Sequence, residues 1–142
     1  MSAYIDTSFL VSLFSPDSNS ISAALTMQKA IGRNVISTLT ELEFVNAMQL
    51  RIFRREISVM QANSSVGLFE QDLRDGVFQL KGLPDAVFER ARKLSLQNTA
   101  KFGTRTADLV HVAAAVELGA DYLYTFDQQQ KKLAQALKLG LN

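Results

Sequence analysis

Short apolar segments alternate with longer segments of mixed polarity along the whole chain. The short segments are rich in β-branched and aromatic residues, which predicts strands at residues 3–6, 34–38, 77–82 and 121–126. Between them, apolar residues recur every three or four positions, which predicts helices. Because strands that alternate with helices need crossover connections, the predicted fold class is α/β. We expect a three-layer α/β/α sandwich with a central, mostly parallel sheet of four to five strands.

The predicted helices differ in how much of their surface is apolar. They span residues 7–14, 18–31, 39–55, 58–76, 84–98 and 109–118, and a last helix begins at Asp127. In the second of them, Ile21, Ala24 and Leu25 lie on one stripe. The helix over residues 109–118 is apolar on nearly every side, which predicts that it is buried.

Length and composition limit the kinds of protein that this chain can be. The length of 142 residues suits a single domain over residues 1–142, and 47% hydrophobic with 20% charged residues is typical of a globular protein. With no apolar run of about 18 residues and no signal-peptide pattern, we expect a cytoplasmic protein without a membrane span. The absence of cysteine and the single histidine exclude thiolate chemistry and multi-histidine metal sites. A net charge of +1 gives no strong electrostatic signal for nucleic acid.

Carboxylates cluster after the predicted strands. Asp6 ends the first strand, Glu41 and Glu43 follow the second, and Asp127 follows the fourth, while Asp108 precedes the buried helix. Ligands of parallel sheets bind outside the carboxyl ends of the strands, so these acids could meet at one edge.

Each acid also has a local explanation. An Asp near a helix start accepts backbone N–H bonds, and this capping interpretation fits Asp6, Asp108 and Asp127. A capping box fits Thr38 with Glu41 and equally Thr40 with Glu43, so the local pattern does not choose between the two glutamates.

Asp108 is the acid that capping explains least well. Thr104 or Thr106 is available as the cap of the buried helix, so a carboxylate carried into the core beside them needs a partner or a cation. Arg105 could be that partner. His111, one turn later, is expected to be a satisfied core or rim histidine without a chemical role.

Converging carboxylates would need positive charge, because they cannot all remain ionised without it. A hard divalent cation held by oxygen ligands, Mg²⁺ or Mn²⁺, meets that need. Such sites favour phosphoryl transfer with a metal-activated water as the nucleophile.

Four motifs in this order give a family resemblance over nearly the whole chain: "YIDTSFL", "TLTELEFVNAM", "GTRTADLVHVAAAVELGA" and "YTFDQQQKKLA". They resemble the PIN-domain nucleases, in particular the VapC-like toxins of prokaryotic toxin–antitoxin pairs. The resemblance implies a PIN-like sandwich and a Mg²⁺- or Mn²⁺-dependent endoribonuclease. It also implies an RNA substrate, a cognate antitoxin and a homodimer.

The resemblance assigns roles to individual residues. The catalytic and metal-binding acids it implies are Asp6, Glu43, Asp108 and Asp127, the last as a further ligand or water anchor. Ser8 and Thr125 fall where the family keeps hydroxyls that orient the metal ligands. Arg105 would meet a substrate phosphate, with pairing to Asp108 as an equal alternative.

Other functions remain as alternatives. A phosphoacceptor receiver domain needs an acid beside Asp6 and a lysine after a late strand, and a haloacid-dehalogenase-type phosphatase needs D-x-D where this chain has Asp6 and Ser8. Neither pattern is present. A PIN-like RNA-processing nuclease that is not a toxin, or a non-catalytic PIN-like binding module, is still open.

Overall fold

The computed structural model describes residues 1–142 and contains one five-stranded sheet. The strands are β1 (Ser2–Ile5), β2 (Arg33–Ser37), β3 (Gln79–Lys81), β4 (Tyr122–Tyr124) and β5 (Gly140–Leu141). They lie in the order β3-β2-β1-β4-β5, and every neighbouring pair is parallel. The predicted parallel sheet is therefore confirmed.

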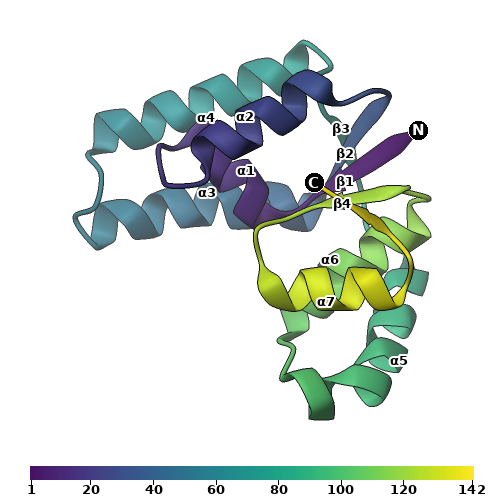
Figure 1. Ribbon diagram of the computed structural model, residues 1–142. Helices are drawn as coiled ribbons and strands as arrows, with labels where there is room; N and C mark the ends of the chain where they lie inside the picture. The colour runs from purple at the N-terminus through teal and green to yellow at the C-terminus, as the bar shows by residue number, and fades with distance from the viewer.

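Seven helices cover the two faces of this sheet. They are α1 (Thr7–Phe14), α2 (Ser20–Lys29), α3 (Thr38–Phe53), α4 (Val59–Arg74), α5 (Asp85–Phe102), α6 (Thr106–Glu117) and α7 (Gln128–Ala136). Helices α1 to α4 pack together on one side of the sheet and α5 to α7 on the other (Figure 1). This is the predicted three-layer sandwich. None of the helices is long and apolar enough to cross a membrane.

The two faces of the sheet have cores of different composition. On the α1–α4 side, aromatic rings dominate, with Phe44 and Phe69 4.8 Å apart between centroids. On the other side, α6 contributes small side chains such as Val112 and Ala113, both fully buried, which confirms the predicted burial of this helix. Side chains alternate along β1, so Tyr4 faces the α6 side while Ile5 faces the aromatic side.

Strand order reverses at β1, the central strand. The chain leaves β1 toward β2 and β3 and later returns to β4 on the other side. In the next residue after β1, the Asp6 N–H donates to the carbonyl of Tyr124 at the end of β4 (3.1 Å). This reversal is the position where parallel α/β sheets bind ligands.

The short edge strand β5 was not located from the sequence. A side chain at Gly140 would lie 2.4 Å from the ring of Tyr122, so only glycine lets β5 approach β4 here. A two-residue segment also carries no measurable periodicity.

The predicted stripe of Ile21, Ala24 and Leu25 on α2 faces solvent, with Ile21 78% and Leu25 49% exposed, and α2 packs through Ala23. The predicted end of α5 is wrong. Helix α5 continues to Phe102 instead of ending near residue 98. It stops at Gly103, whose left-handed backbone (φ 65°) suits glycine.

Candidate active site at the carboxyl edge of the sheet

Asp6 lies fully buried where β1 joins α1. Its Oδ1 accepts the Phe9 N–H (2.9 Å) and so caps α1, as the capping interpretation predicted. The Ser8 hydroxyl donates to the same carboxylate (2.8 Å), and so does that of Thr125 (2.7 Å). No lysine, arginine or histidine forms an ion pair with it. Burial raises the pKa of Asp6 and outweighs the nearby His111 and these hydrogen bonds, which lower it.

Asp127 is both a cap and a member of this edge. Its Oδ1 accepts the N–H groups of Gln129 (2.9 Å) and Gln130 (3.0 Å) at the start of α7. Its backbone N–H donates to the Thr125 hydroxyl (2.9 Å), which in turn donates to Asp6. Its Oδ2 lies 3.7 Å from the guanidinium of Arg105. The Asp127 side chain thus caps α7 with Oδ1, while Oδ2 points toward Arg105 and Asp108.

Neither Thr104 nor Thr106, the caps that we expected, is the N-cap of α6. The N-cap residue is Arg105, and Asp108, three residues into the helix, accepts the Arg105 backbone N–H through Oδ2 (3.1 Å). The Thr104 hydroxyl instead bonds that of Thr99 (2.6 Å). The Arg105 Nε lies 3.6 Å from Asp108, so the predicted pairing of these two residues is present. Asp108 therefore has a capping role, and its partner is a guanidinium that is 80% exposed.

Glu43 is free of any capping role, because both predicted capping boxes of α3 are wrong. Ser37 caps the helix by accepting the Thr40 N–H. Glu43 Oε1 instead accepts from the Thr7 hydroxyl (2.9 Å) and contacts His111 Nε2 (2.5 Å). Burial alone raises the pKa of Glu43, but the hydrogen bond and charge of His111, with Thr7 and Arg105, lower it further than burial raises it. Glu41, the other glutamate that the pattern allowed, makes no side-chain hydrogen bond or ion pair.

His111 is buried, 1% exposed, and fully bonded, as expected for a satisfied core histidine. Its contact with Glu43 was not expected from the sequence. The spacing did place His111 near one acid, because it lies three residues after Asp108 on the same helix face, but it did not identify Glu43 as the partner.

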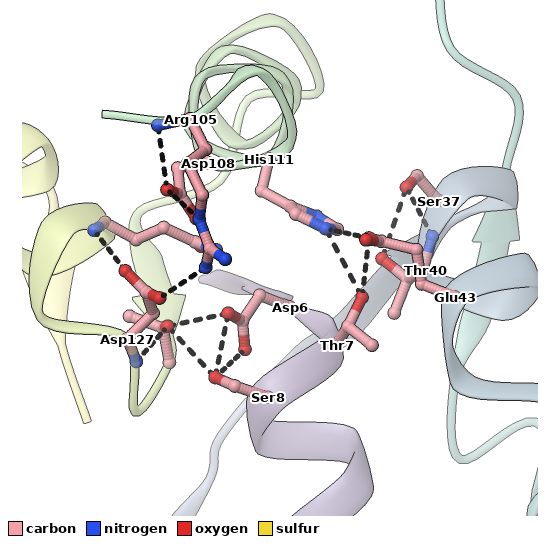
Figure 2. Close-up of polar contacts among 12 residues, drawn as sticks. Asp6, Thr7, Ser8, Ser37, Thr40, Glu43, Arg105, Asp108, His111 and Asp127 are labelled. Atoms are coloured by element: carbon pink, nitrogen blue, oxygen red, sulfur yellow. Dashed lines mark hydrogen bonds and ion pairs between the residues drawn. The ribbon is translucent and has the colours of Figure 1, made fainter. Parts of the chain in front are cut away.

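These contacts form two separate hydrogen-bonded groups at one edge of the sheet. Figure 2 shows Asp6 between two sets of residues: Arg105, Asp108 and Asp127 on one side, and His111, Thr7 and Glu43 on the other. All the acids lie at the carboxyl edge of the sheet, but no three of them lie within reach of a single ion in this arrangement. The acids are thus brought to one region, while Arg105 and His111 hold their carboxylates in separate contacts.

The fold and this edge together define the class of protein. The chain belongs to the PIN-domain family, whose sequence model, described as "PIN domain", matches residues 3–136. No curated protein sequence matches the chain significantly.

Solved structures with the same fold include toxins and their complexes. Mycobacterium tuberculosis VapC20, described as a sarcin-ricin loop cleaving toxin, superposes with a TM-score of 0.69 at 16% identity, covering 92% of this chain and 93% of that one. Rickettsia felis VapBC2, solved with a DNA fragment from its promoter, gives 0.68 at 16% identity, covering 100% and 98%. VapBC-1 from nontypeable Haemophilus influenzae gives 0.65 at 15% identity, covering 100% and 97%. At such identities the likeness shows the fold.

Proposed function

We propose that this protein is a Mg²⁺- or Mn²⁺-dependent endoribonuclease and the toxin of a type II toxin–antitoxin pair. The observation that carries the proposal is Asp6, a fully buried carboxylate with no cationic partner, placed where strand order reverses. A buried carboxylate without counter-charge costs stability, and proteins keep such groups chiefly for function. Membership of the PIN-domain family and the fold shared with toxins support the same conclusion.

The atoms that these four acids offer are of the kind that a hard cation binds. Asp6, Glu43, Asp108 and Asp127 offer only oxygen, which suits Mg²⁺ and Mn²⁺. Glu43 Oε2 and Asp127 Oδ2 accept no hydrogen bond within the chain, so each keeps an oxygen available. When bound, the cation supplies polarisation of a phosphate oxygen and a water of lowered pKa.

The chain's own groups divide the remaining work. Ser8 and Thr125 each donate to Asp6 and so fix the direction of its lone pairs. Arg105 is highly exposed beside Asp108 and Asp127, where its guanidinium can pair with an RNA phosphate in two parallel hydrogen bonds. Binding of the phosphate would draw Arg105 away from the two aspartates.

The partners we propose follow from the toxin assignment. Two of the superposed structures are described as VapBC assemblies, which pair a toxin with a second protein. For this chain we propose a cognate antitoxin and a homodimer. Co-expression with the adjacent reading frame, followed by co-purification, tests the first, and light scattering of the purified chain tests the second.

Cleavage of RNA with and without Mn²⁺ tests the nuclease itself. The unaltered chain is expected to cut a cellular RNA pool only with the metal present. Asp6→Asn and Glu43→Gln should each lower the rate at least ~100-fold, an effect in the range for groups acting in the transition state. Glu41→Gln is the matched control, because it removes the same charge two residues away, about 200° around the same helix.

These cleavage assays distinguish a nuclease from a non-catalytic binding module. Full activity in Asp6→Asn and Glu43→Gln would contradict the site. Absence of metal-dependent cleavage by the unaltered chain, with RNA or protein binding retained, would favour the non-catalytic alternative. Sequencing the cut ends of cellular RNA after induced expression identifies the substrate.

A further inference from the structure

The two oxygens of Glu43 have different surroundings. Oε1 accepts a hydrogen bond from Thr7 and contacts His111 Nε2 at 2.5 Å, while Oε2 has no partner in the chain (Figure 2). The side chain is about one-third exposed, whereas His111 is almost wholly enclosed. The protein thus holds one oxygen firmly and leaves the other available.

The opposite side of the imidazole ring is held by a second buried group. His111 Nδ1 lies 2.9 Å from the Tyr4 hydroxyl, which also lies 2.8 Å from the Ser37 hydroxyl and 3.2 Å from that of Thr40. A tyrosine phenol carries its hydrogen near neutral pH, so the Tyr4 hydroxyl can donate to one of these neighbours. A ring bonded through both nitrogens cannot rotate without losing a buried hydrogen bond.

The direction of the hydrogen bonds follows from the carboxylate. An ionised carboxylate only accepts, so His111 Nε2 must carry the hydrogen that Glu43 Oε1 receives. In the neutral ring the other nitrogen, Nδ1, is then an acceptor, and the Tyr4 hydroxyl donates to it. Ser37, Tyr4, His111 and Glu43 form a chain of contacts that starts at the cap of α3 and ends on its second turn.

This chain of contacts also links Glu43 to the elements that carry the other acids. Tyr4 lies on β1, two residues before Asp6, and His111 lies on α6, three residues after Asp108. Movement of α3 relative to β1 or α6 would therefore break a buried hydrogen bond. The contacts set where Glu43 stands relative to Asp6 and Asp108.

We propose that His111, held by Tyr4, is a positioning residue that orients the Glu43 carboxylate, with Oε1 held by the protein and Oε2 presented to the metal. The proposal rests on the function proposed above. Groups that hold a metal ligand through its second oxygen or nitrogen tune the affinity of the site. His111 does not touch substrate or metal in this role.

Manganese binding measured by calorimetry on the full-length chain is the first test. His111→Ala should weaken Mn²⁺ binding by about 10- to 100-fold, the usual effect of losing such a support. His111→Gln, whose amide N–H can reach the position of Nε2, should recover part of the affinity. Tyr4→Phe removes one oxygen and keeps the shape of the core, so it tests the role even if His111→Ala fails to fold. Glu41→Gln should bind Mn²⁺ like the unaltered chain.

A second readout needs no metal. The chain has one histidine, so its ring ¹⁵N spectrum contains the signals of His111 alone. We expect a protonated Nε2 in the unaltered chain and a smaller Nε2–H population in Tyr4→Phe. A histidine that merely fills the core would lower stability on substitution without changing the affinity for Mn²⁺.

The outcomes distinguish this role from the proposed function. If the unaltered chain binds Mn²⁺ and folded His111→Ala or Tyr4→Phe binds it equally well, the positioning role is wrong and the metal site stands. An Nε2 without its hydrogen also overturns the role. If the unaltered chain binds no Mn²⁺, the metal site fails, and the positioning role fails with it.

Discussion

Asp6 and Glu43 are carboxylates at the same edge of one sheet, yet the protein treats them in opposite ways. Asp6 is wholly buried among two hydroxyls and a backbone N–H, and burial raises its pKa. Glu43 is partly exposed, and although burial raises its pKa, His111 and Thr7 lower it by more, so the net pKa is below the ordinary value. Asp6 is held by two hydroxyls and a backbone N–H, whereas Glu43 is held by an imidazole and one hydroxyl.

The difference shows where a cation would act most strongly. Hydroxyl and amide donors orient a carboxylate but carry no net charge, so the cost of an ionised Asp6 is only partly offset. Glu43 already has its stabilising partner and needs the metal less. The Asp6 side of the edge is therefore where added positive charge should change the energy of the protein most.

Metal-dependent stability is the largest effect expected from this difference. A ligand that binds only the folded state at about 100 times its dissociation constant stabilises by about 2.7 kcal/mol. We expect a gain of that order for the unaltered chain in Mn²⁺, measured by urea unfolding, and almost none for Asp6→Asn. Glu43→Gln should keep part of the gain, and Glu41→Gln all of it. A full gain in Asp6→Asn would remove the distinction between the two acids.

Removing the charge of Asp6 should stabilise the metal-free protein. Folding raises the pKa of this carboxyl group, so the stability it contributes is fully present below its ordinary value of 3.8 and is lost as pH rises through the folded-state value. Asp6→Asn should therefore be more stable than the unaltered chain at neutral pH, by about 1 kcal/mol, as is common when a functional site is neutralised.

The pH dependence provides the control for this prediction. The advantage of Asp6→Asn should disappear in acid, where Asp6 is itself protonated. Glu43→Gln should behave in the reverse way, because a lowered pKa stabilises above the ordinary value and is lost as pH falls through the folded-state value. Thermal unfolding from acid to neutral pH measures both. A neutral-pH loss of stability in Asp6→Asn would show that its hydrogen bonds outweigh its charge.

Much of the fold could be predicted because its signals are local. The helix over residues 7–14 was located to the residue. The helix expected from residue 58 is α4, which Ser58 caps in a capping box with Gln61. The exposed stripe of α2 could not be predicted in the same way. Periodicity identifies an apolar stripe, but which face of α2 meets α1 depends on tertiary packing.

The sequence predicted that these acids gather at one edge of the sheet, but it did not predict their contacts. Family motifs named Asp6, Glu43, Asp108 and Asp127, and the structure brings their elements to one edge. The contact of His111 with Glu43 joins residues 68 apart in the sequence, and no local pattern specifies such a pair. The cap of α6 was wrong for a similar reason, since the Thr104 hydroxyl is engaged by Thr99 on the preceding helix.

Arg105 should have the smallest effect on stability, although it stands beside two of the acids. Its ion pairs with Asp108 and Asp127 are 3.6 and 3.7 Å long, and its side chain is 80% exposed, so solvent and salt screen them. Arg105→Gln should change the unfolding free energy by less than about 0.5 kcal/mol, and by still less at high salt. In cleavage assays the same variant should raise KM for RNA several-fold with little change in kcat, because it removes a phosphate contact. A large loss of stability in Arg105→Gln would mean that this edge already holds an effective counter-charge, and the contrast between Asp6 and Glu43 would then lose its basis.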